Sequence, residues 1–301
     1  MNQNRPAKPT GSLLERAAEI YDFADALRSK ATPVVPTPSA VAAKAVDSVF
    51  RPTADERPVQ SVDQSALRQA GFVLPDGPIS GLSEEFRIIK RQLLLTAAGG
   101  RQGEKILHAE RILICSAHPG EGKTFCAVNL ALSIAAEKDV EVLLVDADFA
   151  KPSILSTLGI AGSPGLMDAL ADPAMDVADC VIRTDLPGLF VLPAGRQTNA
   201  DTEYLASSRT GAVLNALTAP YPNRILIFDS PPILAASPAA ALAGHVGQTV
   251  LVVRADETTE TALRDAVGLL AACDNIQLLL NGVKFSPGGR RFGSYYGQGG
   301  A

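Results

Sequence analysis

A strand-like apolar run, a short loop with two glycines and a helix-like apolar run follow one another near the middle of the chain. The first run, Arg111–Ser116, has the β-branched character of a buried strand, and a helical pattern begins near Lys123. The loop Ala117–Thr124 contains Gly120 and Gly122, which allow backbone torsions that turn successive N–H groups inward. A strand that passes into a helix through such a loop predicts an α/β fold.

The loop fits the Walker A pattern with Ala117 in the place of its first glycine. The N–H groups of the loop and the positive end of the following helix form a phosphate site. We expect Lys123 to reach the β- and γ-phosphates of a nucleotide and Thr124 to offer its hydroxyl to Mg²⁺. The other expected nucleotide contacts are Pro119, Gly120, Glu121, Gly122 and Phe125. The competing interpretation, a chance glycine-rich turn, is disfavoured by the strand and helix on either side.

Five further apolar runs predict strands, and helical patterns separate most of them. The runs are Glu141–Asp146, Leu189–Leu192, Ile225–Asp229, Thr249–Val253 and Gln277–Leu280. Apolar strands that alternate with helices predict a parallel sheet covered on both faces. The predicted fold class is therefore α/β, a P-loop NTPase with a mostly parallel sheet flanked by helices.

Carboxylates follow two of these predicted strands. Asp146 and Asp148 end the first, and Asp229 ends the second. Ligands of parallel α/β sheets bind at the carboxyl ends of the strands, so these groups should meet the phosphate loop. Mg²⁺ prefers hard oxygen ligands and keeps part of its water shell, which suits Asp229 through a water and Asp146 as a second carboxylate. Asp148 is the candidate general base. Each aspartate alone would be explained as a turn or helix-cap residue, but together with the loop they favour catalysis.

The chain divides by composition into four regions. Residues 1–30 contain an amphipathic helix at Ser12–Lys30, and residues 31–80 form a disordered linker rich in proline and alanine. Residues 81–285 form the P-loop domain, and residues 286–301 form a flexible tail rich in glycine. The domain opens with a helix that Ser83 is expected to cap. Its apolar face is Phe86, Ile89, Leu93 and Leu94.

Bulk properties restrict partners and location. The formal net charge of −5 argues against nucleic acid as the main partner. The four cysteines form no metal-ligand pattern and are expected to be small buried apolar residues. No signal-peptide core and no apolar run of about 20 residues is present, which predicts a cytoplasmic protein.

The motifs PGEGKTF, LLVDADFAKPS, FDSPP and EEFRIIKRQLL together resemble those of the bacterial tyrosine kinases. The similarity runs from about Leu82 to the C-terminus and is closest to the exosortase-associated tyrosine autokinases of exopolysaccharide gene clusters. This resemblance implies an ATP- and Mg²⁺-dependent protein-tyrosine kinase. It assigns nucleotide and metal binding to Lys123 and Thr124, and the acidic positions of the site to Asp146, Asp148 and Asp229.

The resemblance also implies assembly and regulation. Glu84, Arg87 and Lys90 match a helical motif for ring-like self-association, with lysine in place of the family's last arginine. Tyr295 and Tyr296 match the C-terminal tyrosines that a neighbouring subunit phosphorylates. A membrane-anchored polysaccharide chain-length determinant protein is the implied activator, which would hold the chain at the inner membrane and link it to exopolysaccharide chain length.

Two other functions stay open. Partition and division-site ATPases carry a second lysine early in the phosphate loop, where this chain has His118, so an ATPase switch of that type is disfavoured. A nucleotide-sensing scaffold without kinase activity is opposed by the complete set of charged site residues. Because the family's tyrosine cluster is longer than this pair, the scaffold function stays open. Turnover of ATP without phosphotyrosine would favour either alternative.

Overall fold

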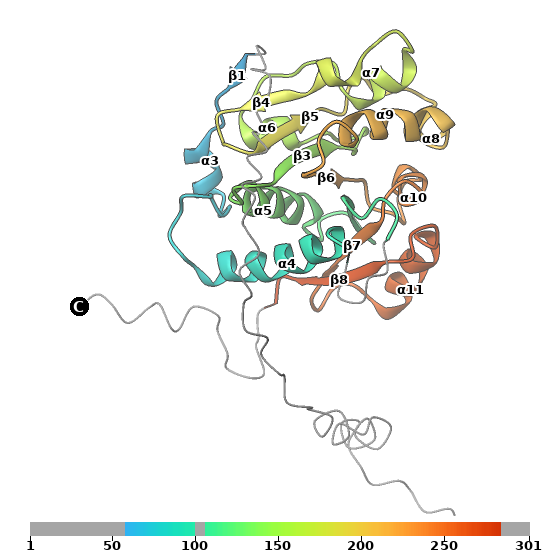
Figure 1. Cartoon of the computed structure of the whole chain (residues 1–301). Helices are drawn as coiled ribbons and strands as arrows, with labels where there is room; N and C mark the ends of the chain where they lie inside the picture. The colour runs from blue at the N-terminus through green and yellow to red at the C-terminus, as the bar shows by residue number, and fades with distance from the viewer. Residues whose placement is uncertain (1–57, 100–105, 284–301) are drawn as a thin grey trace, which may run out of the picture. The chain divides into compact units, whose positions relative to one another are not determined.

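The computed structural model describes residues 58–99 and 106–283, which belong to a single unit spanning Asp55–Ala301 (Figure 1). Three of the predicted features lie outside the described residues: the N-terminal helix, linker residues 31–57 and the tail with Tyr295 and Tyr296. The described part contains one eight-stranded sheet in the order β1-β4-β5-β3-β6-β2-β7-β8.

The strands are β1 (Val59–Gln60), β2 (Arg111–Ser116), β3 (Glu141–Asp146), β4 (Ile182–Thr184), β5 (Leu189–Leu192), β6 (Arg224–Asp229), β7 (Gln248–Arg254) and β8 (Ile276–Asn281). The helices are α3 (Gln64–Gln69), α4 (Gly81–Ala97), α5 (Lys123–Ala135), α6 (Ile154–Leu158), α7 (Leu166–Ala171), α8 (Asp201–Leu205), α9 (Ser208–Thr218), α10 (Pro238–Ala243) and α11 (Glu260–Leu269), with a 3₁₀ turn at Val177–Cys180.

Every pairing in the sheet is parallel except that between β4 and β5. The six predicted strands are therefore confirmed, and the mostly parallel α/β fold with them. The sequence patterns missed β1 and β4, which lie together at one edge and are too short to display a period.

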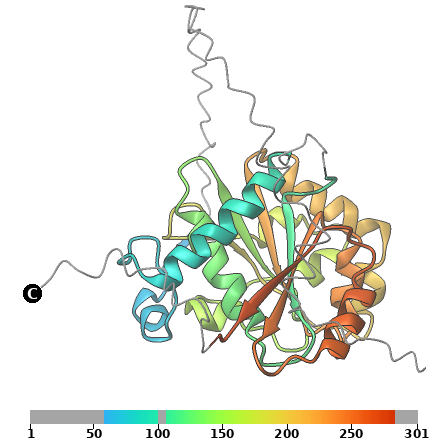
Figure 2. The same ribbon diagram turned by 90° about the horizontal axis from the view of Figure 1, so that it is seen from below.

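Successive side chains along the central strands face two separate apolar cores. On β3, Leu143 and Val145 face one core, and Val142 and Leu144 face the other. The first core is closed by α7–α11 and the second by α3–α6, so helices cover both faces of the sheet (Figures 1 and 2). Continuous apolar strands are what burial on both faces requires.

The cap of α4 differs from the prediction. Ser80, not Ser83, is the N-cap residue, and its hydroxyl accepts from the Ser83 N–H at 3.1 Å. Ser83 returns the bond by accepting from the Ser80 N–H at 2.7 Å, which completes a capping box. Both serines suit a cap, but the helix begins at Gly81, which puts Ser80 at the N-cap and Ser83 inside the first turn.

The predicted linker is wrong over residues 58–80, since this segment packs onto the domain. Asp63 caps α3 by accepting from the Ala66 N–H at 2.9 Å, and Leu67 of that helix is buried. The Val62 N–H donates to Asp185 at 2.9 Å, which ties the segment to the loop after β4. The prolines interrupt regular structure but leave room for a helix of six residues. We therefore place the start of the domain at or before Pro58.

Lys90 does not lie on the surface of α4, as a self-association motif would need. Its side chain reaches the C-terminal end of α5, where the ammonium donates to the Ser133 carbonyl at 2.9 Å and pairs with Glu137 at 2.7 Å. Glu84 and Arg87 of the same motif pair with each other near the surface. A cation at a helix C-terminus is stabilised by the helix dipole, so Lys90 links α4 to α5.

The described cysteines agree with prediction, because all four are buried and unpaired. Burial raises the pKa of Cys115 and of Cys126 to about 12, so neither is a reactive thiolate. Among the residues that the structure describes, none of the helices has the length and apolarity to cross a membrane.

Replacement of Lys90 by methionine should lower the free energy of unfolding by about 1–3 kcal/mol, because the buried carbonyl of Ser133 and the Glu137 carboxylate lose their cation. Arg91, the exposed neighbour, supplies the matched control, and Arg91→Met should change stability by less than about 0.5 kcal/mol. Urea denaturation measures both. Equal stabilities of the two variants would contradict the inward role of Lys90.

Candidate active site

The phosphate loop joins β2 to α5 through two left-handed glycines. Gly120 has φ +81° and Gly122, the residue before α5, has φ +95°. The first turn of α5 therefore points its free N–H groups toward the loop. Pro119 and Gly120 are exposed and lie where a phosphate could approach. The Phe125 side chain packs on Phe72 with ring centroids 5.0 Å apart, so one side of its ring is covered.

Glu121 of the loop points away from the surface. Its side chain is buried, and its carboxylate accepts from the His118 N–H at 2.8 Å and from the hydroxyl of Thr258. The Glu121 carbonyl accepts from the Asn281 side chain at 2.9 Å. These bonds make the Glu121 side chain the anchor of the loop, and the predicted contact of this residue with the nucleotide stays a prediction for its backbone N–H. No motif identified Thr258 as its partner.

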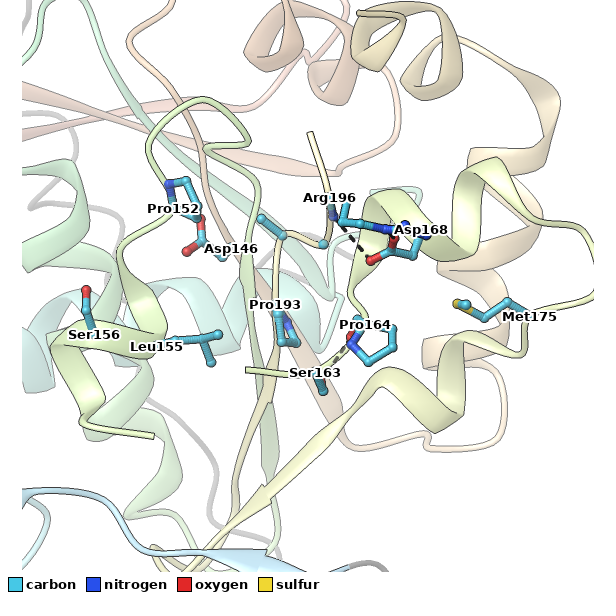
Figure 3. Close-up of a pocket in the computed structure, with 12 residues that line it drawn as sticks. Asp146, Pro152, Leu155, Ser156, Ser163, Pro164, Asp168, Met175, Pro193 and Arg196 are labelled. Atoms are coloured by element: carbon cyan, nitrogen blue, oxygen red, sulfur yellow. Dashed lines mark hydrogen bonds and ion pairs between the residues drawn. The ribbon is translucent and has the colours of Figure 1, made fainter. Parts of the chain in front are cut away.

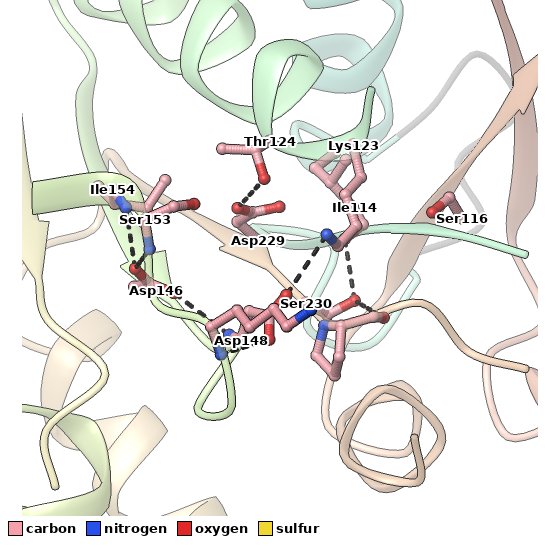
Figure 4. Close-up of polar contacts among 12 residues, drawn as sticks. Ile114, Ser116, Lys123, Thr124, Asp146, Asp148, Ser153, Ile154, Asp229 and Ser230 are labelled. Carbon is pink, nitrogen blue, oxygen red and sulfur yellow. Dashed lines mark hydrogen bonds and ion pairs between the residues drawn. The ribbon is translucent and has the colours of Figure 1, made fainter. Parts of the chain in front are cut away.

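The three predicted carboxylates meet at the carboxyl ends of β3 and β6. Asp146 and Asp229 are direct partners in the register of these strands. Thr124 donates its hydroxyl to one oxygen of Asp229 at 2.7 Å (Figure 4). The other oxygen of Asp229 is buried and has no hydrogen-bond partner within the described part of the chain. Such an oxygen fits a water or a cation that approaches from the loop side.

Asp146 organises the chain that follows β3. One of its oxygens accepts from the N–H groups of Ser153 and Ile154 at 2.8 and 3.0 Å, and the other accepts from the Asp148 N–H at 3.2 Å. These bonds curl residues 147–153 back toward the strand end and fix the start of α6. The curl brings Asp148 to 3.4 Å from the Lys123 ammonium (Figure 4).

The paired carboxylates are electrostatically unfavourable in this form of the protein. Burial raises the pKa of Asp229 to about 7 against the lowering effects of Thr124 and Lys123. Burial likewise raises the pKa of Asp146 to about 6, although three backbone N–H groups favour its ionised form. Asp148 adds like charge and raises both values further. The site therefore holds protons more tightly than isolated aspartates do.

The donor set fits a hard divalent cation that keeps waters. The available groups are a hydroxyl on Thr124 and carboxylate oxygens on Asp146 and Asp229, all of the hard type that Mg²⁺ prefers. No group of three or more His, Cys, Asp or Glu side chains encloses a metal within residues 58–99 and 106–283. Most ligands would then come from water and nucleotide oxygens, which is the usual arrangement for Mg²⁺ beside phosphates.

Stability of the nucleotide-free protein should fall as pH rises from about 4 to about 8. A carboxyl whose folded pKa is raised contributes stability below its unfolded pKa, and this contribution is lost as pH rises through the folded value, here about 6 for Asp146 and about 7 for Asp229. Asp229→Asn removes one of the buried charges. The variant should therefore be more stable than the parent at pH 8 by at least about 1 kcal/mol, with a smaller difference at pH 4.

Thermal melts across this pH range make the comparison. Asp265→Asn, at an exposed aspartate in the middle of α11, is the matched control. A parent protein whose stability rises steadily from pH 4 to 8 would refute the raised values.

Comparison with known proteins finds similar tyrosine-protein kinases. No protein-family model matches the chain. It is 30% identical over 226 residues to the tyrosine-protein kinase YwqD of Bacillus subtilis, an alignment that covers 74% of this chain and 91% of YwqD. It is 29% identical over 188 residues to the tyrosine-protein kinase Wzc of Salmonella typhimurium, covering 62% of this chain but 25% of Wzc.

A solved structure gives the same answer for the fold. The kinase domain of the Escherichia coli tyrosine kinase ETK superposes with a TM-score of 0.59 at 25% identity, covering 76% of this chain and 92% of that domain. YwqD is matched over nearly its whole length, whereas the chain spans about a quarter of Wzc. By its sequence, its parallel sheet and its phosphate loop, this chain belongs to the bacterial tyrosine kinase family.

Proposed function

We propose that this protein is a protein-tyrosine autokinase that uses ATP and Mg²⁺ and phosphorylates Tyr295 and Tyr296 of its tail. The observation that carries the proposal is the convergence of Lys123, Thr124 and Asp229 with the Asp146–Asp148 loop at one sheet edge. Family membership supports nucleotide and metal use in general, and the oxygen donors support Mg²⁺ in particular.

The chain's own groups have separate tasks in this proposal. Lys123 moves from Asp148 to the β- and γ-phosphates, which frees the Asp148 carboxylate. The hydroxyl oxygen of tyrosine forms a bond to the γ-phosphorus, and the bond from that phosphorus to the β–γ bridging oxygen breaks. ADP leaves with that electron pair, and Asp148 takes the phenolic proton. Thr124 and Asp229 would hold Mg²⁺, with Asp146 beside them, and the bound metal would neutralise charge on the phosphates.

Organisation and partners follow from the family. Residues 286–301 carry the proposed acceptors. Subunits phosphorylate one another within a homo-oligomer, whose interface includes Glu84 and Arg87 on the surface of α4. The resemblance to bacterial tyrosine kinases implies that a partner protein activates the kinase. We assign that role to a membrane-anchored chain-length determinant, with exopolysaccharide synthesis as the process controlled.

Purified protein with ATP and Mg²⁺ should acquire phosphate on Tyr295 or Tyr296, mapped by mass spectrometry. Lys123→Met should abolish it, and Asp148→Asn should slow it by about 10²–10⁴-fold while nucleotide binding remains. Arg264→Gln, at an exposed arginine of α11, is the control and should retain the parent rate.

Transfer between subunits is tested by mixing. A chain with Lys123→Met supplies tyrosines, and an active chain with Tyr295→Leu and Tyr296→Leu supplies the site. Phosphotyrosine on the first chain establishes transfer in trans. Release of phosphate from ATP without phosphotyrosine, even with the cytoplasmic segment of a candidate activator present, would replace the proposal by an ATPase switch. ATP binding with neither product would leave a scaffold.

A further inference from the structure

The two sides of the candidate nucleotide site differ in how closely the chain fills them. On the side of β3 and β5, a pocket of about 500 Å³ opens, lined by Asp146 and the loop Pro193–Arg196 (Figure 3). On the side of β7 and β8, side chains reach from the ends of these strands to the phosphate loop and bond to Glu121. This second side therefore has the contacts that can fix the shape of the loop.

Glu121 carries a buried carboxylate in the middle of the phosphate loop. The residue is 4% exposed. Burial of a carboxylate is unfavourable unless hydrogen-bond donors surround it. One of its oxygens accepts from the His118 N–H at 2.8 Å, and the other accepts from the Thr258 hydroxyl. The first donor belongs to the loop itself, so the bond from Thr258 is the one that ties the carboxylate to another part of the domain.

Thr258 lies in the turn between β7 and α11, and its hydroxyl has a defined orientation. The hydroxyl oxygen accepts from the Arg254 N–H at 2.8 Å, and the Thr258 N–H donates to the Arg254 carbonyl at 3.0 Å. A hydroxyl can donate one proton, and an ionised carboxylate can only accept. The proton of Thr258 is therefore directed to Glu121, and the turn presents a fixed donor to the loop.

The backbone of Glu121 is held from the end of β8. The Asn281 side chain donates to the Glu121 carbonyl at 2.9 Å, and the Asn281 carbonyl accepts from the Ala255 N–H at 2.9 Å in the turn that contains Thr258. A Cβ added to Gly122 would lie 2.1 Å from the Asn281 amide nitrogen, so this strand end and the loop are in close contact. The ends of β7 and β8 thus hold Glu121 through both its side chain and its carbonyl.

The position of Glu121 in the loop gives these bonds their effect. Gly120 and Gly122, with φ +81° and +95°, are the residues at which the loop could most easily change shape. Glu121 lies between them, so fixing it restricts both glycines and the N–H groups around them, which face a bound phosphate in loops of this type. A loop that is ordered before its ligand arrives binds that ligand more tightly, because less entropy is lost on binding.

We propose that Thr258 is a positioning residue for the nucleotide, which acts through the Glu121 carboxylate and, together with Asn281, holds the phosphate loop in its binding shape. The inference rests on the proposed ATP and Mg²⁺ site and adds to it a residue that no motif marks. Without the Thr258 hydroxyl, the carboxylate loses a donor and can turn toward solvent, where its charge opposes that of the phosphates. Nucleotide binding then weakens although the reacting groups are unchanged.

Calorimetric titration of the full chain with ADP and Mg²⁺ tests the binding effect. Thr258→Val removes the hydroxyl and nearly keeps the shape of the side chain, and Thr258→Ser returns a hydroxyl. Thr261→Val, at an exposed threonine of α11, is the matched control. Thr258→Val should raise the Kd for ADP by about 5–50-fold, because a hydrogen bond to a charged group is lost. Thr258→Ser should recover most of the parent affinity.

The kinase assay separates positioning from chemistry. Thr258→Val should raise the KM for ATP by a similar factor and change kcat by less than about 3-fold, because the loop holds the phosphates equally before and during transfer. A purely structural role would lower the melting temperature and leave the Kd of the folded protein unchanged. Unchanged Kd and KM in Thr258→Val would overturn the inference, as would a Thr258→Ser variant that binds ADP no better than Thr258→Val.

A double-mutant cycle tests whether Thr258 acts through Glu121. Glu121→Ala removes the carboxylate, so adding Thr258→Val to it should change the Kd by less than about 2-fold further. If the effects of the two substitutions multiply instead, Thr258 acts by another route and the inference is overturned. If Glu121→Ala proves unfolded in a thermal melt, the comparison of Thr258→Ser with Thr258→Val decides alone.

The calorimetric arm does not depend on phosphoryl transfer. If Thr258→Val weakens ADP binding but the parent forms no phosphotyrosine, the positioning role stands and the kinase function falls. If phosphotyrosine forms and Thr258→Val leaves the KM for ATP unchanged, the kinase function stands and the positioning role falls. A parent chain that binds no ADP in the presence of Mg²⁺ would overturn both.

Discussion

The parallel register of β2, β6 and β3 determines where every charged group of the site lies. Asp229 is the register partner of Asp146 on one side and of Ile114 on the other, so the two acidic strands and the strand that enters the phosphate loop end at one edge. A shift of β6 by a single residue would turn Asp229 into an apolar core and bring Phe228 to the site. The two cores prevent that shift, because neighbouring residues of each strand are committed to opposite faces.

The edge that this register creates is costly for the isolated protein. Three carboxylates and one ammonium share a largely desolvated space, and the pKa values of Asp146 and Asp229 rise accordingly. The hydrogen bonds at Asp146 and the pair between Lys123 and Asp148 offset part of this cost. A metal–nucleotide complex would relieve the rest, since it brings the cation that the carboxylates lack and the phosphates to which the lysine can turn. The unbalanced negative charge of the ligand-free site therefore favours binding of a metal–nucleotide complex.

Local patterns predicted the parts that repeat within a few residues, and the structure agrees with them: six strands, the phosphate loop and the aspartates at strand ends. What escaped prediction depends on contacts between distant segments. The sequence around Glu121 indicates a surface residue of a glycine-rich loop. In the structure its carboxylate accepts a hydrogen bond from Thr258, which lies in the distant loop after β7. The sequence pattern places Lys90 on a charged helix face, but its ammonium donates to the Ser133 carbonyl of α5. The edge strands β1 and β4 are too short to show a period.

The hydrogen bond from the Asn281 side chain to the Glu121 carbonyl fixes the end of β8 to the phosphate loop. Asn281 is the last residue of β8, so the chain leaves the described domain at a point attached to its own phosphate loop. A tether of 12 residues from Val283 to Tyr295 would give the tyrosine an effective concentration in the millimolar range near that loop. Transfer to a neighbouring subunit competes with this only when an assembly holds the neighbour at a comparable local concentration. The order of the reaction in protein concentration therefore reports the assembly state: first order within a stable oligomer or within one chain, and second order when subunits must first collide.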